Sequence, residues 1–265
     1  MTNGITITNA IIESIVSRST TKYYDPAVTL SDDQIRELVR IGTTAPTSFH
    51  LQNWRFIAVR TPEAKARLRP IAWDQPAITE AAVTFIVCGQ LADSSVIPER
   101  LAPLVEAGIM PAKMVPEWEI PARDLYMEYP QRQRDEAVRT GTFGAAAMIY
   151  AAHALGLGST PMIGFDAEAV AREFALAEDE VPVMLLSVGA ALPKNWPQKP
   201  RRPVADVLEF AGPRNVFDPE KAFPAVTPAG SIERERAPAE WTPLPPLERD
   251  PGCDGRDCEG EAAEV

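Results

Sequence analysis

Residues 141–166 read GTFGAAAMIYAAHALGLGSTPMIGFD, and this stretch determines how the rest of the chain is interpreted. It carries no Asp, Glu, Lys or Arg before its last residue, which predicts that it lies in the interior. Its alanines favour a helix with a thin layer of side chains, against which another backbone can pack closely. We expect Gly156 and Gly158 to end this helix, because glycine adopts positive φ without strain. Residues 159–164 should then form a turn that contains Pro161, and Asp166 should cap the next helix.

Three interpretations of this stretch differ in what they imply about function. A transmembrane helix needs about 18 or more strongly apolar residues, and the central glycines and weakly apolar alanines disfavour it. The second interpretation is a buried core helix without a chemical role. The third is a close-packed helix at a subunit interface, followed by a glycine turn whose backbone faces a ligand. Composition alone leaves the last two open.

The composition of the 265-residue chain sets outer bounds on its function. Because 45% of its residues are hydrophobic, it can bury a substantial core. Its net charge of -11 argues against binding to nucleic-acid phosphates, which requires clustered Lys and Arg. The first ten residues lack the basic and apolar regions of a signal peptide, so we expect a cytoplasmic protein without a membrane segment.

Patterns in the rest of the chain predict helices interleaved with buried strands. The expected helices cover residues 9–17, a segment capped by Ser31 and Gln34, a short helix begun by Thr61 and Pro62, and residues 167–174. The expected strands are residues 54–59, the run VTFIVCG within 80–89, and residues 183–189. This interleaving predicts a mixed sheet covered by helices on both faces.

Residues 91–140 contain six prolines among charged and aromatic residues. We expect an irregular insert, which is either a lid over a site or a surface excursion without a role.

Two short segments concentrate positive charge in this acidic chain. The first is RSTTK at residues 18–22, where the first helix pattern stops, and the second is KNWPQKPRRP at residues 194–203. Considered separately, the first segment is interpreted as a cationic helix end and the second as a solvated basic loop. Taken together, they suggest one anionic ligand, because arginine and hydroxyl groups bind phosphate well.

The last part of the chain, residues 212–265, is proline-rich and acidic. It lacks hydrophobic periodicity, so we expect an extended or disordered extension separate from a domain of residues 1–211. Cys253 and Cys258 in this extension could hold a metal only with two further ligands, and the chain has two histidines in total. We therefore expect a solvated tail and no metal site.

Four motifs occur in an order that is typical of one protein family. They are RSTTK at 18–22, APTS at 45–48 followed by Gln52 and Trp54, the helix ending in AAHALGLGSTPMIGFD, and KPRRP at 199–203. Over roughly residues 11–210 the chain therefore resembles the nitroreductase family of FMN-dependent oxidoreductases. The resemblance implies an α+β fold, an α/β sandwich with a mixed, mainly antiparallel sheet flanked by helices. It also implies a homodimer with FMN bound at the interface.

The same resemblance implies where FMN binds. The first segment and the KPRRP loop would surround the phosphate and ribityl chain, with Lys22 near the pyrimidine edge, while residues 163 and 164 would face flavin N5. The implied cofactor-binding residues are Arg18, Ser19, Thr20, Lys22, Pro46, Thr47, Ser48, His50, Asp74, Pro161, Met162, Ile163, Gly164, Lys199 and Arg201.

The implied activity is hydride transfer from NAD(P)H to FMN and then to a small conjugated acceptor, such as a nitroaromatic or a quinone, in a ping-pong cycle. We expect no obligatory side-chain acid or base, since the cofactor performs the chemistry, and His153 is interpreted as a packed helix residue. One alternative is a specialised member that carries out reductive dehalogenation, dehydrogenation or flavin fragmentation. Another is a flavin-binding interaction protein without turnover.

Four positions depart from the family pattern. His50 stands where Asn is common, and Asn53 stands where Pro usually precedes the Trp. Asp74 stands where an Asn often approaches the flavin, and Ala77 replaces a basic residue found in some members. A carboxylate facing an anionic reduced flavin would be unfavourable. We therefore expect Asp74 either to turn away or to lower the redox potential.

Overall fold

The computed structural model describes residues 10–210 of the chain. A first compact unit ends at Arg202, and the described residues 203–210, with a short 3-10 turn at Val204–Asp206, belong to a second unit. The domain boundary expected at residue 211 lies at the edge of the described residues and stays a prediction. The acidic extension, residues 212–265 with Cys253 and Cys258, lies outside the described residues.

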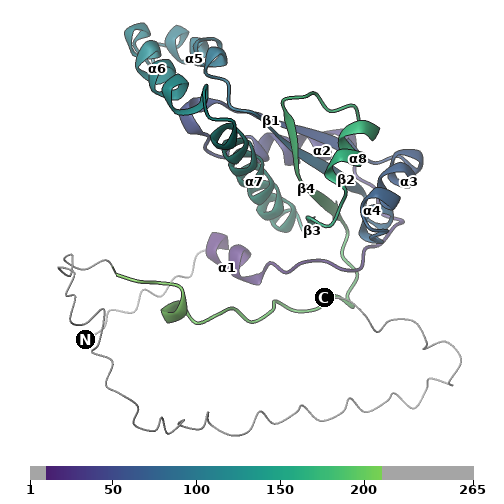
Figure 1. Ribbon diagram of the computed structural model, residues 1–265. Helices are drawn as coiled ribbons and strands as arrows, with labels where there is room; N and C mark the ends of the chain where they lie inside the picture. The colour runs from purple at the N-terminus through teal and green to yellow at the C-terminus, as the bar shows by residue number, and fades with distance from the viewer. Residues whose placement is uncertain (1–9, 211–265) are drawn as a thin grey trace, which may run out of the picture. The chain divides into compact units, whose positions relative to one another are not determined.

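A four-stranded antiparallel sheet forms the centre of the first unit (Figure 1). Its strands are β1 (Trp54–Val59), β2 (Val83–Gln90), β3 (Gly158–Met162) and β4 (Glu180–Gly189), in the order β1-β2-β4-β3. The α+β class is therefore confirmed. The sheet was expected to be mixed and mainly antiparallel, and its three strand pairs are all antiparallel. The parallel pairing among the described residues is an isolated bridge between Thr20 and Ser159.

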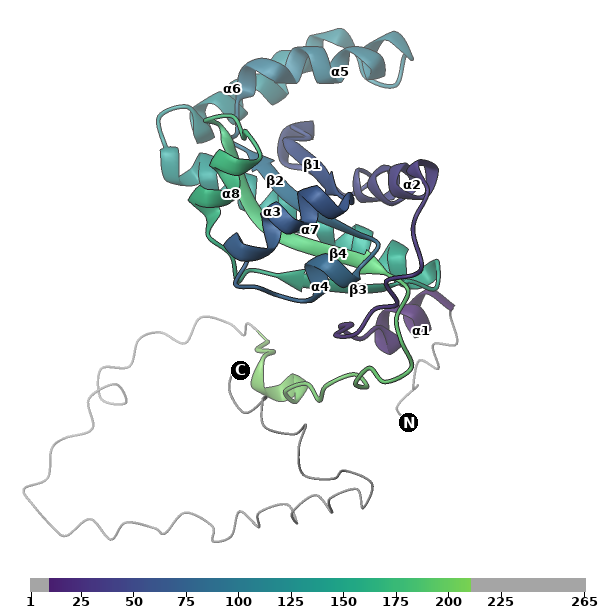
Figure 2. The same cartoon turned by 90° about the vertical axis from the view of Figure 1, so that its right-hand side faces the viewer.

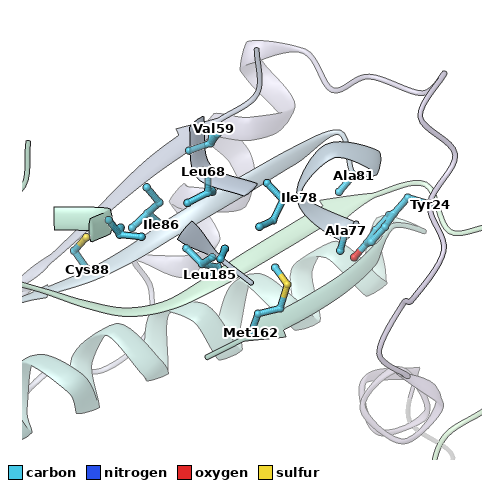
Figure 3. Close-up of a cluster of buried hydrophobic side chains, with 12 residues drawn as sticks. Tyr24, Val59, Leu68, Ala77, Ile78, Ala81, Ile86, Cys88, Met162 and Leu185 are labelled. Carbon is cyan, nitrogen blue, oxygen red and sulfur yellow. The ribbon is translucent and has the colours of Figure 1, made fainter. Parts of the chain in front are cut away.

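Helices cover both faces of the sheet because its central strands are apolar on both sides. On one face, Val83, Phe85 and Val87 of β2 belong to a core shared with α2 (Asp32–Gly42) and α7 (Pro130–Ala154). On the other face, Ile86 and Cys88 belong to a core shared with α3 (Pro62–Ile71), α4 (Ala77–Glu80) and α8 (Ala167–Glu173). Figure 3 shows the second core, with Leu68 and Ile78 beside Ile86.

Helix α7 lies directly on the backbone of the sheet. A Cβ atom placed on Gly89 of β2 would lie 1.9 Å from the carbonyl oxygen of Ala137 in α7. The expected close packing of this helix is therefore observed, although the glycine that permits it lies on the strand. Among residues 10–210, no helix is both long enough and apolar enough to cross a bilayer.

The insert expected to be irregular is helical, so that prediction is wrong. Residues 91–140 form η2 (Ser94–Val96), α5 (Ile97–Glu106), η3 (Ala112–Met114), α6 (Val115–Tyr126) and the first part of α7. Three of its prolines, Pro98, Pro116 and Pro130, stand in the first turn of a helix, where a missing N–H costs little. Figure 2 shows α5 and α6 at the opposite end of the first unit from α1 (Ala10–Ser17).

The segment expected to be a turn, residues 159–164, is largely strand β3. Pro161 is tolerated there because β3 is an edge strand, on which one row of N–H groups has no partner strand. Gly156, with φ of 75°, follows α7 as expected, whereas Gly158 begins β3. The capping roles predicted for Ser31, Thr61 and Asp166 are confirmed.

Candidate functional site

One asparagine joins the first basic segment to the loop that follows β4. The Asn195 Oδ1 atom accepts hydrogen bonds from the backbone N–H groups of Lys22 (2.6 Å) and Tyr23 (2.9 Å). Its Nδ2 atom donates to the carbonyl groups of Tyr23 and Leu192, both at 2.8 Å. Four bonds from one side chain therefore hold Lys22 beside a loop about 170 residues away in sequence. Asn195 was not predicted from the sequence, where its only signal is its place after Lys194 in a loop bounded by Pro193 and Pro197.

Residues 20–24 are also attached to the edge of the sheet. The Thr21 N–H donates to the carbonyl of Ser159 in β3 at 3.0 Å. The buried Tyr24 hydroxyl lies 2.6 Å from Thr160 Oγ1 and donates to the carbonyl of Ser187 at 3.2 Å. Burial raises the pKa of Tyr24, so its hydroxyl stays protonated at neutral pH. The segment that carries Thr20 and Lys22 is thus fixed on a rigid element.

A pocket of about 200 Å³ lies between the two basic segments. Thr20 and Lys22 of the first segment and Lys199 and Arg201 of the second all line it. Its other lining residues are Trp196, Pro197 and Gln198, so none of the described lining residues is acidic. Lys22, expected at the edge of a ring, shares this pocket with the two distant cations. Arg18 and Ser19 lie in the same segment but outside the lining set.

Aromatic rings alternate with the lysines around this pocket. The Trp196 ring centroid lies 5.8 Å from Lys22 Nζ and 5.6 Å from Lys199 Nζ. The Tyr23 centroid lies 5.1 Å from Lys22 Nζ and 4.2 Å from Lys194 Nζ. Because cation–π attraction offsets part of the repulsion between the ammonium groups, the cations can gather in one place. Such a pocket is suited to binding an anion.

A second group of predicted site residues forms the turn after β3. A Cβ atom on Gly164 would lie 2.6 Å from Trp73 Cε3, so any larger residue would have to displace this indole. The Gln75 Nε2 atom donates to the Gly164 carbonyl at 2.9 Å. The Ile163 side chain is 81% exposed, whereas Met162 is buried in the core shown in Figure 3. Of residues 161–164, the side chain of Met162 is thus turned into the protein.

Asp74 is turned toward helix α3. Its carboxylate accepts a hydrogen bond from Arg69 Nε at 2.6 Å, and this bond raises the pKa of the arginine. Trp73 and Asp74 both have positive φ, 52° and 54°, which is uncommon for residues other than glycine and is often found at functional sites. The ion pair with Arg69 favours the first of the two outcomes expected for Asp74, and the choice between them stays a prediction.

The third group, Pro46 to His50, lies against α5 and α6. The backbone bends sharply at η1 (Ser48–His50), where Phe49 and His50 have φ of 48° and 57°. The Ser48 hydroxyl is hydrogen-bonded to the Tyr126 hydroxyl at 2.8 Å. Thr47 Oγ1 accepts from the Gln52 N–H, and the Gln52 side chain contacts His50 Nε2 at 2.9 Å. The loop is therefore held in one conformation by its own side chains and by α6.

The unusual Asn53 has a structural role. Its Nδ2 atom donates to the Gln90 carbonyl at 2.6 Å, and its Oδ1 atom accepts from Thr140 Oγ1 at 2.9 Å. This buried residue therefore joins the start of β1 to the end of β2 and to α7.

Within one chain, the third group lies far from the pocket. Trp54, at the start of β1, pairs with Gly89, which pairs with Val181, whereas Ser159 pairs with Val188. The spacing between strands places β1 and β3 roughly 14 Å apart across the sheet. The register places Trp54 and Ser159 roughly 24 Å apart along the strand direction. The two groups occupy diagonally opposite corners of the sheet.

No cluster of three or more potential metal ligands occurs within residues 10–210.

Comparison with known proteins gives consistent matches. A sequence model described as the nitroreductase family matches residues 15–190. YdgI of Bacillus subtilis, a proposed NAD(P)H nitroreductase, is 31% identical over 207 residues, which cover 77% of this chain and 98% of that protein. YodC of the same organism, also a proposed NAD(P)H nitroreductase, is 30% identical and covers 74% and 96% of the two chains. The crystal structure of a proposed nitroreductase from Exiguobacterium sibiricum in complex with FMN has a TM-score of 0.71 at 25% identity, over 77% of this chain and 98% of that one.

Proposed function

Because this chain belongs to the nitroreductase family, we propose that it is an FMN-dependent oxidoreductase that uses NAD(P)H to reduce a small conjugated acceptor, such as a nitroaromatic or a quinone. The names of the two Bacillus relatives and the FMN in the Exiguobacterium structure support this proposal. When bound, FMN supplies the redox chemistry, taking hydride from the nicotinamide and giving it to the acceptor in a separate half-reaction.

The observation that carries the proposal is the convergence of Lys22, Lys199 and Arg201 on one pocket. A phosphate monoester bears nearly two negative charges at neutral pH, and an acidic protein must gather cations to hold it. Hydrogen bonds to charged groups contribute about 1.5–3 kcal/mol each, so these residues fit a phosphate. We assign Lys199 and Arg201, with Thr20 and Arg18, to binding the FMN phosphate and ribityl chain. We assign Lys22 to the pyrimidine edge of the ring and Ser19 to supporting its segment.

We also assign the turn after β3 to the flavin ring. Trp73 and Gln75 hold this turn in place, as the contacts of Gly164 indicate. The Ile163 side chain and the backbone of Pro161 to Gly164 therefore offer a fixed surface for the ring. Asp74, paired with Arg69, keeps its charge engaged with a cation beside that surface.

A homodimer explains why the Pro46–His50 loop lies at the far corner of the sheet. One mononucleotide cannot contact both corners of a single chain, but a second copy can bring its loop to the first copy's pocket. Helix α7 offers an apolar contact for such a copy, because Phe143 and Tyr150 are 48% and 41% exposed on one side of it. We therefore propose that Pro46, Thr47, Ser48 and His50 complete the site of a neighbouring subunit.

An absorption spectrum of the purified protein, followed by anaerobic addition of NADH or NADPH, tests the proposal. We expect a bound yellow flavin that one nucleotide bleaches and that a quinone or nitroaromatic reoxidises. The variants Lys199→Ala and Arg201→Ala should each weaken FMN binding at least tenfold. A colourless protein that takes up no FMN would refute the proposal, and a flavin that neither nucleotide reduces would leave binding without turnover.

A further inference from the structure

A buried chain of hydrogen bonds leads from α7 to the Pro46–His50 loop. Glu136, on α7, is almost completely buried and contacts the Tyr126 hydroxyl through Oε2 at 3.1 Å. The same hydroxyl, on α6, is 2.8 Å from Ser48 Oγ. Ser48 itself is only half-buried, so this chain of hydrogen bonds ends at a residue that is partly accessible at the surface.

The donors and acceptors in this chain have one consistent direction. A guanidinium group only donates hydrogen bonds, and Arg139 donates to Glu136 Oε2. Oε2 is therefore an acceptor, and the Tyr126 O–H donates its single proton to it. The Tyr126 oxygen can then bind Ser48 only by accepting, so the Ser48 hydroxyl proton is committed to Tyr126. The Ser48 oxygen therefore has only its lone pairs left to offer a further partner, so it can accept but not donate a hydrogen bond.

The surroundings keep this direction from reversing. Burial, together with the nearby Glu136, raises the pKa of Tyr126, so the phenol remains a donor at neutral pH. The Thr140 hydroxyl, one turn further along α7, binds Asn53 Oδ1 at 2.9 Å and fixes this part of the helix against the sheet. Gly89 and Ala137 allow no sliding of α7 over β2, because the backbones are already in contact.

We propose that Glu136 and Tyr126 are positioning residues that hold Ser48 as a hydrogen-bond acceptor, so that the ligand group received by Ser48 is an N–H or O–H donor. This inference rests on the proposed function, in which the Ser48 loop completes an FMN site. A flavin ring carries both N–H donors and carbonyl acceptors, and a serine whose proton is already used distinguishes between them. Helix α6, part of the segment expected to be irregular, thereby contributes to ligand recognition without touching the ligand.

Riboflavin binding to the flavin-free protein tests this inference, because riboflavin lacks the phosphate and reports on contacts of the ring and the ribityl chain. Ser48→Ala should raise the riboflavin dissociation constant about three- to tenfold, as expected for one hydrogen bond. Tyr126→Phe frees the Ser48 proton and should raise it about two- to threefold. In the double variant Tyr126→Phe should add nothing to Ser48→Ala, since Tyr126 acts only through Ser48.

Tyr129→Phe is the matched control, because it removes a phenol hydroxyl as Tyr126→Phe does. Tyr129 is 45% exposed at the start of α7 and lies outside this chain of hydrogen bonds. We expect riboflavin binding within twofold of the wild type.

Three results would overturn the inference. The first is tighter riboflavin binding in Tyr126→Phe, and the second is an equal effect of Tyr126→Phe in the wild type and in the Ser48→Ala variant. The third is unchanged riboflavin binding in Ser48→Ala. Thermal melting of each variant identifies a loss of folding, and Ser48→Ala alone decides the case if Tyr126→Phe unfolds. A wild-type protein that binds neither FMN nor riboflavin refutes the proposed function and, with it, this inference. Normal binding without an effect of Ser48→Ala refutes the inference alone.

Discussion

Asn195 shows how one residue can assemble a site whose charged residues are visible in the sequence. Its side chain makes four hydrogen bonds to the backbone around Lys22 and Leu192. The positive charges at residues 18–22 and 199–203 suggested a shared ligand from residue type alone. The residue that joins the two segments could not be predicted, because its partners lie about 170 positions away in the sequence.

We predict that Asn195→Ala weakens both the fold and the pocket. Unpaired backbone N–H groups cost about 1–3 kcal/mol, so the free energy of unfolding should fall by that amount. FMN affinity should fall at least tenfold, because Lys22 loses its fixed place beside the 195–201 loop. Urea unfolding and FMN titration measure the two effects. Asn195→Asp keeps the acceptor and loses the two donated bonds, so it should lie between the alanine variant and the wild type. A folded alanine variant with unchanged FMN affinity would contradict this role.

Cys88 gives a pH-dependent prediction at the same scale. It is buried in β2, and burial, with the Glu180 charge as a second cause, raises the pKa of its thiol from about 9 to about 12. Above pH 9 the unfolded chain releases this proton while the folded chain keeps it, so stability is lost as the pH rises from 9 toward 12. In Cys88→Ala the fall in unfolding free energy between pH 9 and pH 11 should be smaller by about 1 kcal/mol per pH unit. Equal slopes in urea unfolding at these pH values would show that the thiol does not contribute.

Among the elements, the contact between α7 and β2 has the least room for change. A Cβ atom on Gly89 would meet backbone atoms of Ala137, which cannot move aside as a side chain can. We predict that Gly89→Ala lowers the unfolding free energy by about 3 kcal/mol or more. Gly108→Ala is the control, since φ of 69° strains any other residue but no atom lies within 4 Å of the new methyl group. It should lower the unfolding free energy by about 1 kcal/mol, and similar losses in both variants would refute the close approach.

Sequence patterns identified elements where one physical signal dominated. The β-branched run in β2, the capping box at Ser31 and the N-cap at Asp166 are local, and each was predicted at its observed place. The prediction of an irregular insert at residues 91–140 was wrong because proline either breaks a helix or begins one. Only the tertiary contacts of α5 and α6 decide which of the two occurs. The prediction of a turn at residues 159–164, where β3 is observed, was wrong for a related reason. Pro161 is excluded from a central strand but accepted on an edge, and strand order is not a local property.

For the whole molecule, the candidate site divides into parts that one chain cannot bring together. Residue types predicted each part, but their separation depends on the order β1-β2-β4-β3, which places β1 and β3 on opposite edges. Residues 141–165 carry no charged side chain and were expected to be interior, yet Phe143 and Tyr150 are partly exposed in one chain. They lie two turns apart on α7 and so share one face. Both features have one explanation if a second copy covers α7 and supplies the Pro46–His50 loop.

Phe143→Glu tests this explanation, because it places a charge at the centre of the exposed face of α7 and leaves the pocket of its own chain intact. Burying an unpaired carboxylate in an interface is unfavourable, so the dimer dissociation constant should rise at least tenfold. FMN affinity should fall with it, since a monomer lacks the loop of the second copy. Light scattering after size-exclusion chromatography, combined with FMN titration at several protein concentrations, measures both. Ile109→Glu is the control, because Ile109 is 75% exposed in the loop after α5 and should leave assembly unchanged. A Phe143→Glu monomer that binds FMN as tightly as the wild type would show that one chain builds the site alone.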